Sequence, residues 1–165
     1  MGTTRHTWVT NTLHEQPIDR VQFIRKSNDE YMRGMKIHYR DGTSQVINSD
    51  SGEDAGTFQF EQGDMLIGLN MKCTSPSDKR PRQLGFILLR GGLIFETEMY
   101  GNSISKYTQV WPTIESLQGR QDAETLRITK ISWSKWGSGD DDLSGIRLHT
   151  ASSESEQLGA ERYNW

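Results

Sequence analysis

The sequence is poor in cysteine and has no long apolar run. Cys73 is the single cysteine among 165 residues, so an intrachain disulfide is excluded, and a lone thiol suits a reducing compartment. The longest apolar runs, Phe86 to Leu89 and Leu93 to Phe95, are far shorter than the ~20 residues that a membrane-spanning helix needs. We therefore predict no membrane span, and a small, partly buried strand side chain for Cys73.

An excess of basic residues is also missing. Lys and Arg number 19 against 22 Asp and Glu, a formal net charge of −3 that disfavours general binding to nucleic-acid phosphates. Residues 1–11 are polar and lack the apolar segment of a secretory signal, which together with the lone thiol predicts a cytoplasmic location. The four histidines show no zinc-binding spacing, and residues 140–142, three consecutive aspartates, lack the spacing of a calcium loop. We therefore expect no metal and no cofactor.

Short strands are what the sequence does contain. Only 33% of the residues are hydrophobic, and many alternate with polar residues, as in Val21 to Ile24, Met35 to Tyr39 and Thr57 to Phe60. The pair Asp41-Gly42 tolerates the positive φ angles of a tight hairpin turn. Strands about ten residues apart with Gly-rich turns predict an all-β fold, either a prism, a sandwich or a barrel.

Strands are predicted in the second half of the chain as well. Ile114 to Leu117 and Leu126 to Trp133 fit the strand pattern, with a polar loop at 118–125 between them. Residues 74–82, which hold two prolines and four charges, are predicted to form an exposed loop.

The composition shifts after Trp136 to Gly, Ser and Asp. We therefore expect one domain over residues 1–136. An acidic and polar tail is expected over 137–165, with one last edge strand at 146–149.

Three segments of the chain resemble one another. They are Phe23 to Tyr39, Phe60 to Cys73, and Leu117 to Trp133, and each has an apolar strand, a short polar loop and a longer apolar strand. The residues matched in the longer strand are Met35, Ile37 and Tyr39, then Leu69, Met71 and Cys73, then Thr129, Ile131 and Trp133.

These blocks, taken in order, resemble the jacalin-like lectins. Ile18 to Val21 resembles the family's first core strand, and Met32 to Gly42 its "I-x-x-I-x-V-x-Y-x-D-G" hairpin. Phe58 to Gly68 is similar to its "F-x-L-x-x-G-E-Y-I-x-x-V" run, and Ile114 to Arg120 to its "I-x-G-F-x-G-R". The resemblance spans roughly residues 18–136. It implies a β-prism of three Greek-key sheets with pseudo-threefold symmetry.

The same resemblance implies a carbohydrate site at the loop opened by Gly119 and Arg120. In the family this loop ends in Leu-Asp, and the Asp binds sugar hydroxyls, whereas here Leu126 is followed by Arg127. A carboxylate acceptor, backbone donors and an aromatic face are the groups that a sugar site needs. The candidate ligand-binding residues are Gly119, Arg120, Gln121, Asp122, Glu124 and Trp111.

The sequence therefore predicts a lectin-like protein that binds a mono- or oligosaccharide without catalysis and self-associates. No standard catalytic motif is found, and the catalytic residues are unknown. Two alternatives stay open. One is an enzyme that cyclises or isomerises a small hydrophobic substrate in an aromatic pocket, and the other is a protein-interaction module that has lost the sugar site. The residues expected to line or serve such a pocket are Trp8, Tyr100, Tyr107, Trp111 and Trp136, with His38 or Asp29 for proton transfer.

Overall fold

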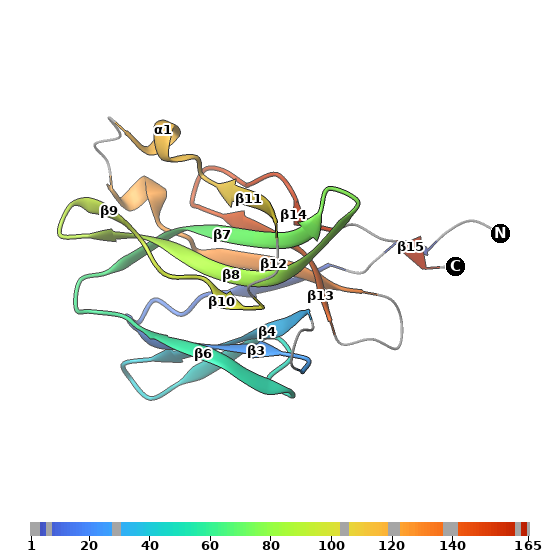
Figure 1. Ribbon diagram of the computed structural model, residues 1–165. Helices are drawn as coiled ribbons and strands as arrows, with labels where there is room; N and C mark the ends of the chain where they lie inside the picture. The colour runs from blue at the N-terminus through green and yellow to red at the C-terminus, as the bar shows by residue number, and fades with distance from the viewer. Residues whose placement is uncertain are drawn as a thin grey trace.

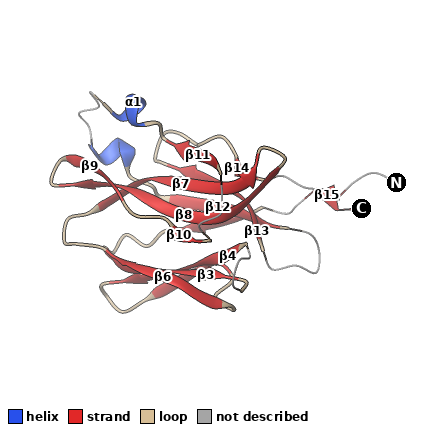
Figure 2. Ribbon diagram, in the orientation of Figure 1, coloured by secondary structure: helices blue, strands red, loops and turns tan. Residues whose placement is uncertain are grey.

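Three antiparallel β-sheets form the body of the protein in a computed structural model (Figure 1). The structure describes residues 4–5, 8–27, 31–102, 106–118, 123–136, 142–160 and 163–164. Strands dominate these residues, and helix occurs only in two short turns at one end of the molecule (Figure 2). In this described part, we find no helix with the length and apolar character needed to span a membrane.

The first sheet has the strand order β5-β4-β3-β6. Its strands are β3 (Ile18–Arg25), β4 (Met32–Tyr39), β5 (Ser44–Asn48) and β6 (Glu53–Gln59). The turn between β4 and β5 contains Gly42, whose φ of 90° is the positive value expected for the Asp41-Gly42 pair.

The second sheet has the order β10-β8-β7-β11, with β9 also paired to β8. Its strands are β7 (Met65–Ser75), β8 (Asp78–Arg90), β9 (Leu93–Glu96), β10 (Tyr100–Gly101) and β11 (Tyr107–Trp111). The prediction of an exposed loop at 74–82 is wrong, because β7 and β8 continue into this segment and Ser75 pairs with Asp78 across the turn. Pro81 fits inside β8 with its side chain buried.

The third sheet has the order β14-β13-β12-β2. Its strands are β12 (Lys130–Lys135), β13 (Leu143–His149), β14 (Leu158–Gly159) and β2 (Val9–Thr12). Next to the chain ends, β1 (Thr4–Arg5) pairs with β15 (Tyr163–Asn164) in a separate two-stranded ribbon.

All three sheets share one Greek-key order. A hairpin of two consecutive strands lies in the middle, the next strand pairs with its second strand, and a fourth strand pairs with its first. In the third sheet the fourth place is taken by β2 from the start of the chain, which ties the N-terminal segment to β12. The predicted all-β fold of three Greek-key sheets is therefore confirmed.

The larger of two hydrophobic clusters forms the main core between the sheets, and the smaller one consists of Ile67, Ile87, Leu117 and Leu126. Each sheet contributes fully buried side chains, among them Phe23 from the first, Phe86 from the second and Ile146 from the third. The Phe23 ring is stacked on Tyr100 with 4.7 Å between the ring centroids, which joins the first two sheets. Alternation along the strands places these side chains inward, as the period-two pattern predicted.

The C-terminal prediction requires correction. Residues 146–149 belong to β13, which lies between β12 and β14 and is therefore a central strand of the third sheet. Ser144 and Gly145 are buried there. The Ser144 hydroxyl donates to the carbonyl of Ala160 at 2.8 Å, so its burial is compensated by a hydrogen bond. Of the described residues after 136, Leu143–His149 and Leu158–Gly159 thus belong to the third sheet, whereas the polar connection at 151–154 is exposed.

The prediction of a strand at Ile114 to Leu117 is also wrong, because these residues form the short helix α1 (Ile114–Leu117). The side chain of Thr113 caps this helix by accepting a hydrogen bond from the backbone N–H of Ser116. The 3₁₀ helix η1 (Ala123–Leu126) follows, and β12 begins only at Lys130. The described residues on either side of 119–122 are therefore helical turns, Ile114–Leu117 and Ala123–Leu126, and not strands of a sheet.

The internal repeat is present, but in a different register. The central hairpins are β3–β4, β7–β8 and β12–β13, so β4 corresponds to β8 and not to β7. Met35 was matched with Leu69, yet Met35 lies on the second strand of its hairpin and Leu69 on the first. Both strands of a hairpin show the same alternation, so the pattern alone did not distinguish them.

Cys73 lies in a strand, β7, as predicted, but it is fully buried and not partly buried. Its thiol donates to the backbone carbonyl of Lys79 at 3.0 Å, and burial raises its pKa to about 12. We expect the folded protein to resist a thiol reagent at pH 8 and to react fully once denatured, because the thiolate is the reactive form. Absorbance of the released chromophore measures this reaction, and stoichiometric labelling of the folded protein would contradict it.

Candidate binding pocket

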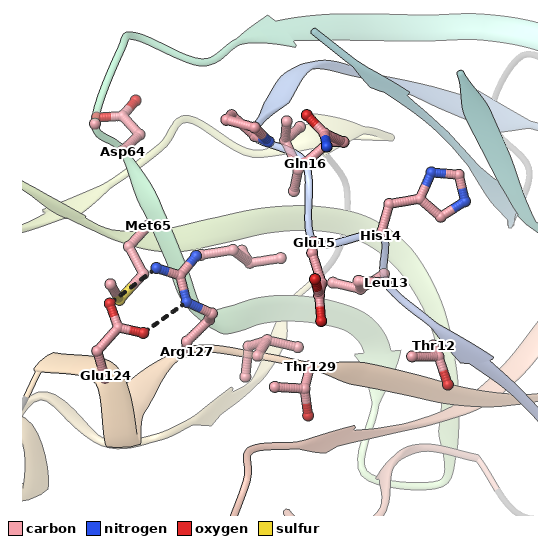
Figure 3. A pocket seen from close by; sticks show the side chains of 15 residues that line it. Thr12, Leu13, His14, Glu15, Gln16, Asp64, Met65, Glu124, Arg127 and Thr129 are labelled. Atoms are coloured by element: carbon pink, nitrogen blue, oxygen red, sulfur yellow. Dashed lines mark hydrogen bonds and ion pairs between the residues drawn. The ribbon is translucent and has the colours of Figure 1, made fainter. Parts of the chain in front are cut away.

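A pocket with a volume of about 560 Å³ opens beside η1 and the start of β7, at the end of the molecule where α1 lies (Figure 1 and Figure 3). Three segments that are far apart in the sequence form its walls: residues 12–18 between β2 and β3, residues 63–66 at the start of β7, and residues 124–129 from η1 toward β12. A volume in this range suits a small organic ligand.

Backbone hydrogen bonds hold these walls together. The N–H of Leu13 donates to the carbonyl of Thr129 at 2.9 Å, and the N–H of Ile128 donates to the carbonyl of Leu66 at 3.0 Å. Side chains on the same segments form the apolar part of the lining, which consists of Leu13, Pro17, Ile18, Met65, Leu66 and Ile128. This part contains no aromatic ring.

Polar groups line the rest of the pocket. Glu15 and Gln16 lie on one wall and are exposed, and Thr129 lies on the neighbouring segment (Figure 3). His14 turns away from the centre, since its Nδ1 is 2.9 Å from the hydroxyl of Thr43 and its ring stacks on Tyr39.

Glu124 and Arg127 form an ion pair on the wall opposite Glu15 (Figure 3). The Arg127 side chain donates from Nε at 3.1 Å and from Nη2 at 3.0 Å to the two carboxylate oxygens. The hydrogen bond from Arg127 holds the pKa of Glu124 below its usual value. Arg127, the residue that departs from the family pattern, is therefore already engaged by a predicted site residue.

Asp64 marks the rim of the pocket where β7 begins. Burial by itself raises the pKa of Asp64, but hydrogen bonds from Arg90 and from the backbone N–H of Glu61 outweigh this effect, so the pKa is lower than usual. Arg90 donates from Nε at 2.9 Å and from Nη2 at 2.8 Å. The turn at 61–64 is thereby fixed against β8.

The predicted site residues are divided between different places. Glu124 lines the pocket, whereas Trp111 packs against the main core at the end of β11 and is not part of the lining. Gly119, Arg120, Gln121 and Asp122 lie outside the described residues. The sequence did not predict the walls formed by residues 12–18 and 63–66, because only the tertiary structure brings these segments next to Glu124.

The aromatic residues considered for an enzymatic pocket have other partners. Trp8 lies under the Arg147 guanidinium, Tyr100 stacks on Phe23, and Trp136 lies against Arg80. None of the five lines the pocket, and Asp29 lies outside the described residues. Within the described residues, His, Cys, Asp and Glu side chains form no group of three suited to a metal.

A second polar cluster lies at the other end of the sheets from the pocket, where β4, β8 and β13 begin and β12 ends. The Arg80 guanidinium lies between two rings, with its central carbon 3.7 Å from the centroid of Tyr31 and 4.2 Å from that of Trp136. It donates to the hydroxyl of Tyr31 at 2.8 Å and to Asp78 at 3.2 Å, and its Nη1 is 4.0 Å from the carboxylate of Asp142. We call these five side chains the hairpin-end cluster.

Comparison with known proteins reveals likeness only at the level of structure. No family model matches the sequence, and no curated protein matches it. Among solved structures, Calystegia sepium agglutinin matches with a TM-score of 0.51 and 11% identity, covering 99% of this chain and 95% of the agglutinin. A Malaysian banana lectin variant matches with a TM-score of 0.47 and 12% identity, covering 91% of this chain and 99% of the lectin.

Both solved structures are jacalin-like lectins with the β-prism fold. Together with the strand order of the three sheets, the match to the agglutinin shows that this chain has the same fold. An identity of 11% establishes the fold alone, because sites differ widely among proteins that share a fold.

Proposed function

We propose that this β-prism protein binds a carbohydrate without catalysis and that the end pocket is its site. The observation that carries the proposal is the combination of a cavity of about 560 Å³ with a lining that contains both aliphatic and polar side chains. Sugar rings present both C–H surfaces and hydroxyl groups, so they need this combination of contacts. The lectin fold of the solved neighbours supports the same class of ligand.

Each part of the lining has a role in this proposal. The carboxylate of Glu15 accepts hydrogen bonds from two neighbouring hydroxyls, while Gln16 and Thr129 both donate and accept. Leu13 and Ile128 pack against the C–H face of the ring. Glu124, one of the candidate ligand-binding residues, accepts from hydroxyls with the lone pairs that Arg127 leaves unused.

A glycan array that includes mannose, galactose and glucose ligands at high protein concentration tests the proposed binding. We expect a specific hit, and Glu15→Ala should weaken its affinity at least about tenfold, because a hydrogen bond to a charged acceptor is worth about 1.5 kcal/mol or more. Calorimetric titration with the hit measures this loss. Glu156→Ala, an exposed acid outside the pocket lining, is the matched control.

Two outcomes would count against this proposal. Array signals at background level for all glycans would contradict the proposed carbohydrate binding itself. Loss of binding in Trp136→Ala, together with full binding in Glu15→Ala, would move the site to the hairpin-end cluster. The fold of each variant is checked by circular dichroism.

Three further expectations from the sequence stay predictions. Self-association through β2, an edge strand with mostly exposed residues, would cover unpaired backbone groups. A cytoplasmic location accords with the single buried thiol. Nucleic acid is not expected as a partner, given the net charge of −3.

A further inference from the structure

The charged side chains of the pocket differ in whether they are already paired. Asp64 is held by two hydrogen bonds from Arg90, and Glu124 is held by two from Arg127. Glu15 also lines the pocket, and it forms no ion pair or hydrogen bond with the residues that the structure describes. Glu15 is therefore the acid in this lining whose negative charge is not compensated by a described side chain, so a ligand meets its full charge.

The pocket offers little to an anionic ligand. Arg127 is the single Lys or Arg in the described lining, and its guanidinium already faces the two oxygens of Glu124. A ligand carboxylate would have to displace Glu124 or approach Glu15 without compensation. Like charges brought together in this way lower affinity and thereby exclude the wrong ligand.

Ring stacking contributes little to selection here. The described lining has no Phe, Tyr or Trp, and its apolar part is aliphatic, so one sugar ring gains about as much from it as another. Discrimination between sugars must therefore come from the polar groups, and Glu15 is the group with the largest unpaired charge.

From this geometry we infer that the pocket selects a saccharide that carries a protonated amine, which places its ammonium group against Glu15. This inference deepens the proposed carbohydrate binding and rests on it. An amino sugar keeps the ring and the remaining hydroxyls of its neutral counterpart, so the other contacts of the pocket are unchanged. The exposure of Glu15 limits the gain, since water screens a charge pair at the surface.

Three matched pairs of sugars test the inference: glucosamine with glucose, galactosamine with galactose, and mannosamine with mannose. Each pair differs only in an ammonium group in place of one hydroxyl at pH 6. Titrations followed by backbone amide shifts of the full chain give both affinities. We expect the amino sugar of at least one pair to bind at least about fivefold more tightly, which corresponds to roughly 1 kcal/mol. We expect glucuronic acid to bind more weakly than glucose.

Glu15→Gln is the decisive variant, because it keeps the shape and hydrogen-bonding groups of the side chain but removes the charge. The ratio of the two affinities within a pair should fall to about one, whatever happens to either affinity alone. Glu156→Gln should leave the ratio at the wild-type value. A ratio near one in the wild type, or a ratio that survives Glu15→Gln, would overturn the inference while leaving carbohydrate binding intact. Absence of binding by all six sugars would overturn both.

Discussion

Replacing Arg80 with methionine should destabilise the protein by about 3 kcal/mol, because it leaves a buried carboxylate without its nearby guanidinium. Arg80 lies between Tyr31 and Trp136 and bonds to Asp78, so one side chain joins strand ends of all three central hairpins. The Asp142 carboxylate next to it is only 1% exposed. Methionine fills a similar volume but supplies neither the charge nor the donors.

Urea unfolding followed by circular dichroism measures this loss through the shift in the midpoint at constant slope. Arg127→Met is the control, because the side chains of Arg127 and its partner Glu124 are 47% and 71% exposed, and such pairs contribute at most about 1 kcal/mol. Adding Asp142→Asn to Arg80→Met should recover part of the loss, since it removes the buried charge. If Arg80→Met alone were as stable as the wild type, the hairpin-end cluster would not hold the hairpins together.

Asp64→Asn should cost about 2 kcal/mol at pH 7, because hydrogen bonds to a charged acceptor are stronger than those to a neutral amide. Asp64 is 1% exposed and accepts from Arg90 and from the N–H of Glu61. Loss of these bonds frees the turn at 61–64, which forms the rim of the pocket. The variant should therefore also weaken ligand binding.

The cost of Asp64→Asn should depend on pH in one direction. Because the folded pKa of Asp64 lies below its ordinary value of 3.8, the native state binds fewer protons there than the unfolded state. The stabilisation is complete above that ordinary value and is lost as the pH falls through the folded pKa. Wild type and variant should thus converge in acid.

Unfolding curves between pH 7 and pH 2 measure this convergence. Glu61→Gln is the control, since Glu61 lies 3.4 Å from Arg90 but is 66% exposed, and its removal should matter little at any pH. A constant difference between wild type and Asp64→Asn over the whole range would show that the charge of Asp64 contributes nothing.

Local sequence patterns were sufficient to predict a strand where one face of the strand is buried and a turn residue marks the end of the strand. The alternation in β3 and β4 and the Asp41-Gly42 turn predicted the first hairpin, and Cys73 lies in a strand as predicted. They failed where polar residues are buried. Polar residues such as Ser144 in β13 led to the prediction of a polar tail. The hydrogen bond from Ser144 to the carbonyl of Ala160, which compensates the burial of Ser144, cannot be recognised in the local sequence.

The sequence by itself determined that the chain is an all-β protein of short strands arranged in three related blocks, since alternation and turn chemistry are local properties. Only the tertiary structure decided which strands pair, that β2 completes the third sheet, and that Glu15 faces the ion pair of Glu124 and Arg127 across a pocket. The reason is physical: a strand's hydrogen-bonding edges accept partners from any distance along the chain, and the packing of the whole core selects among them.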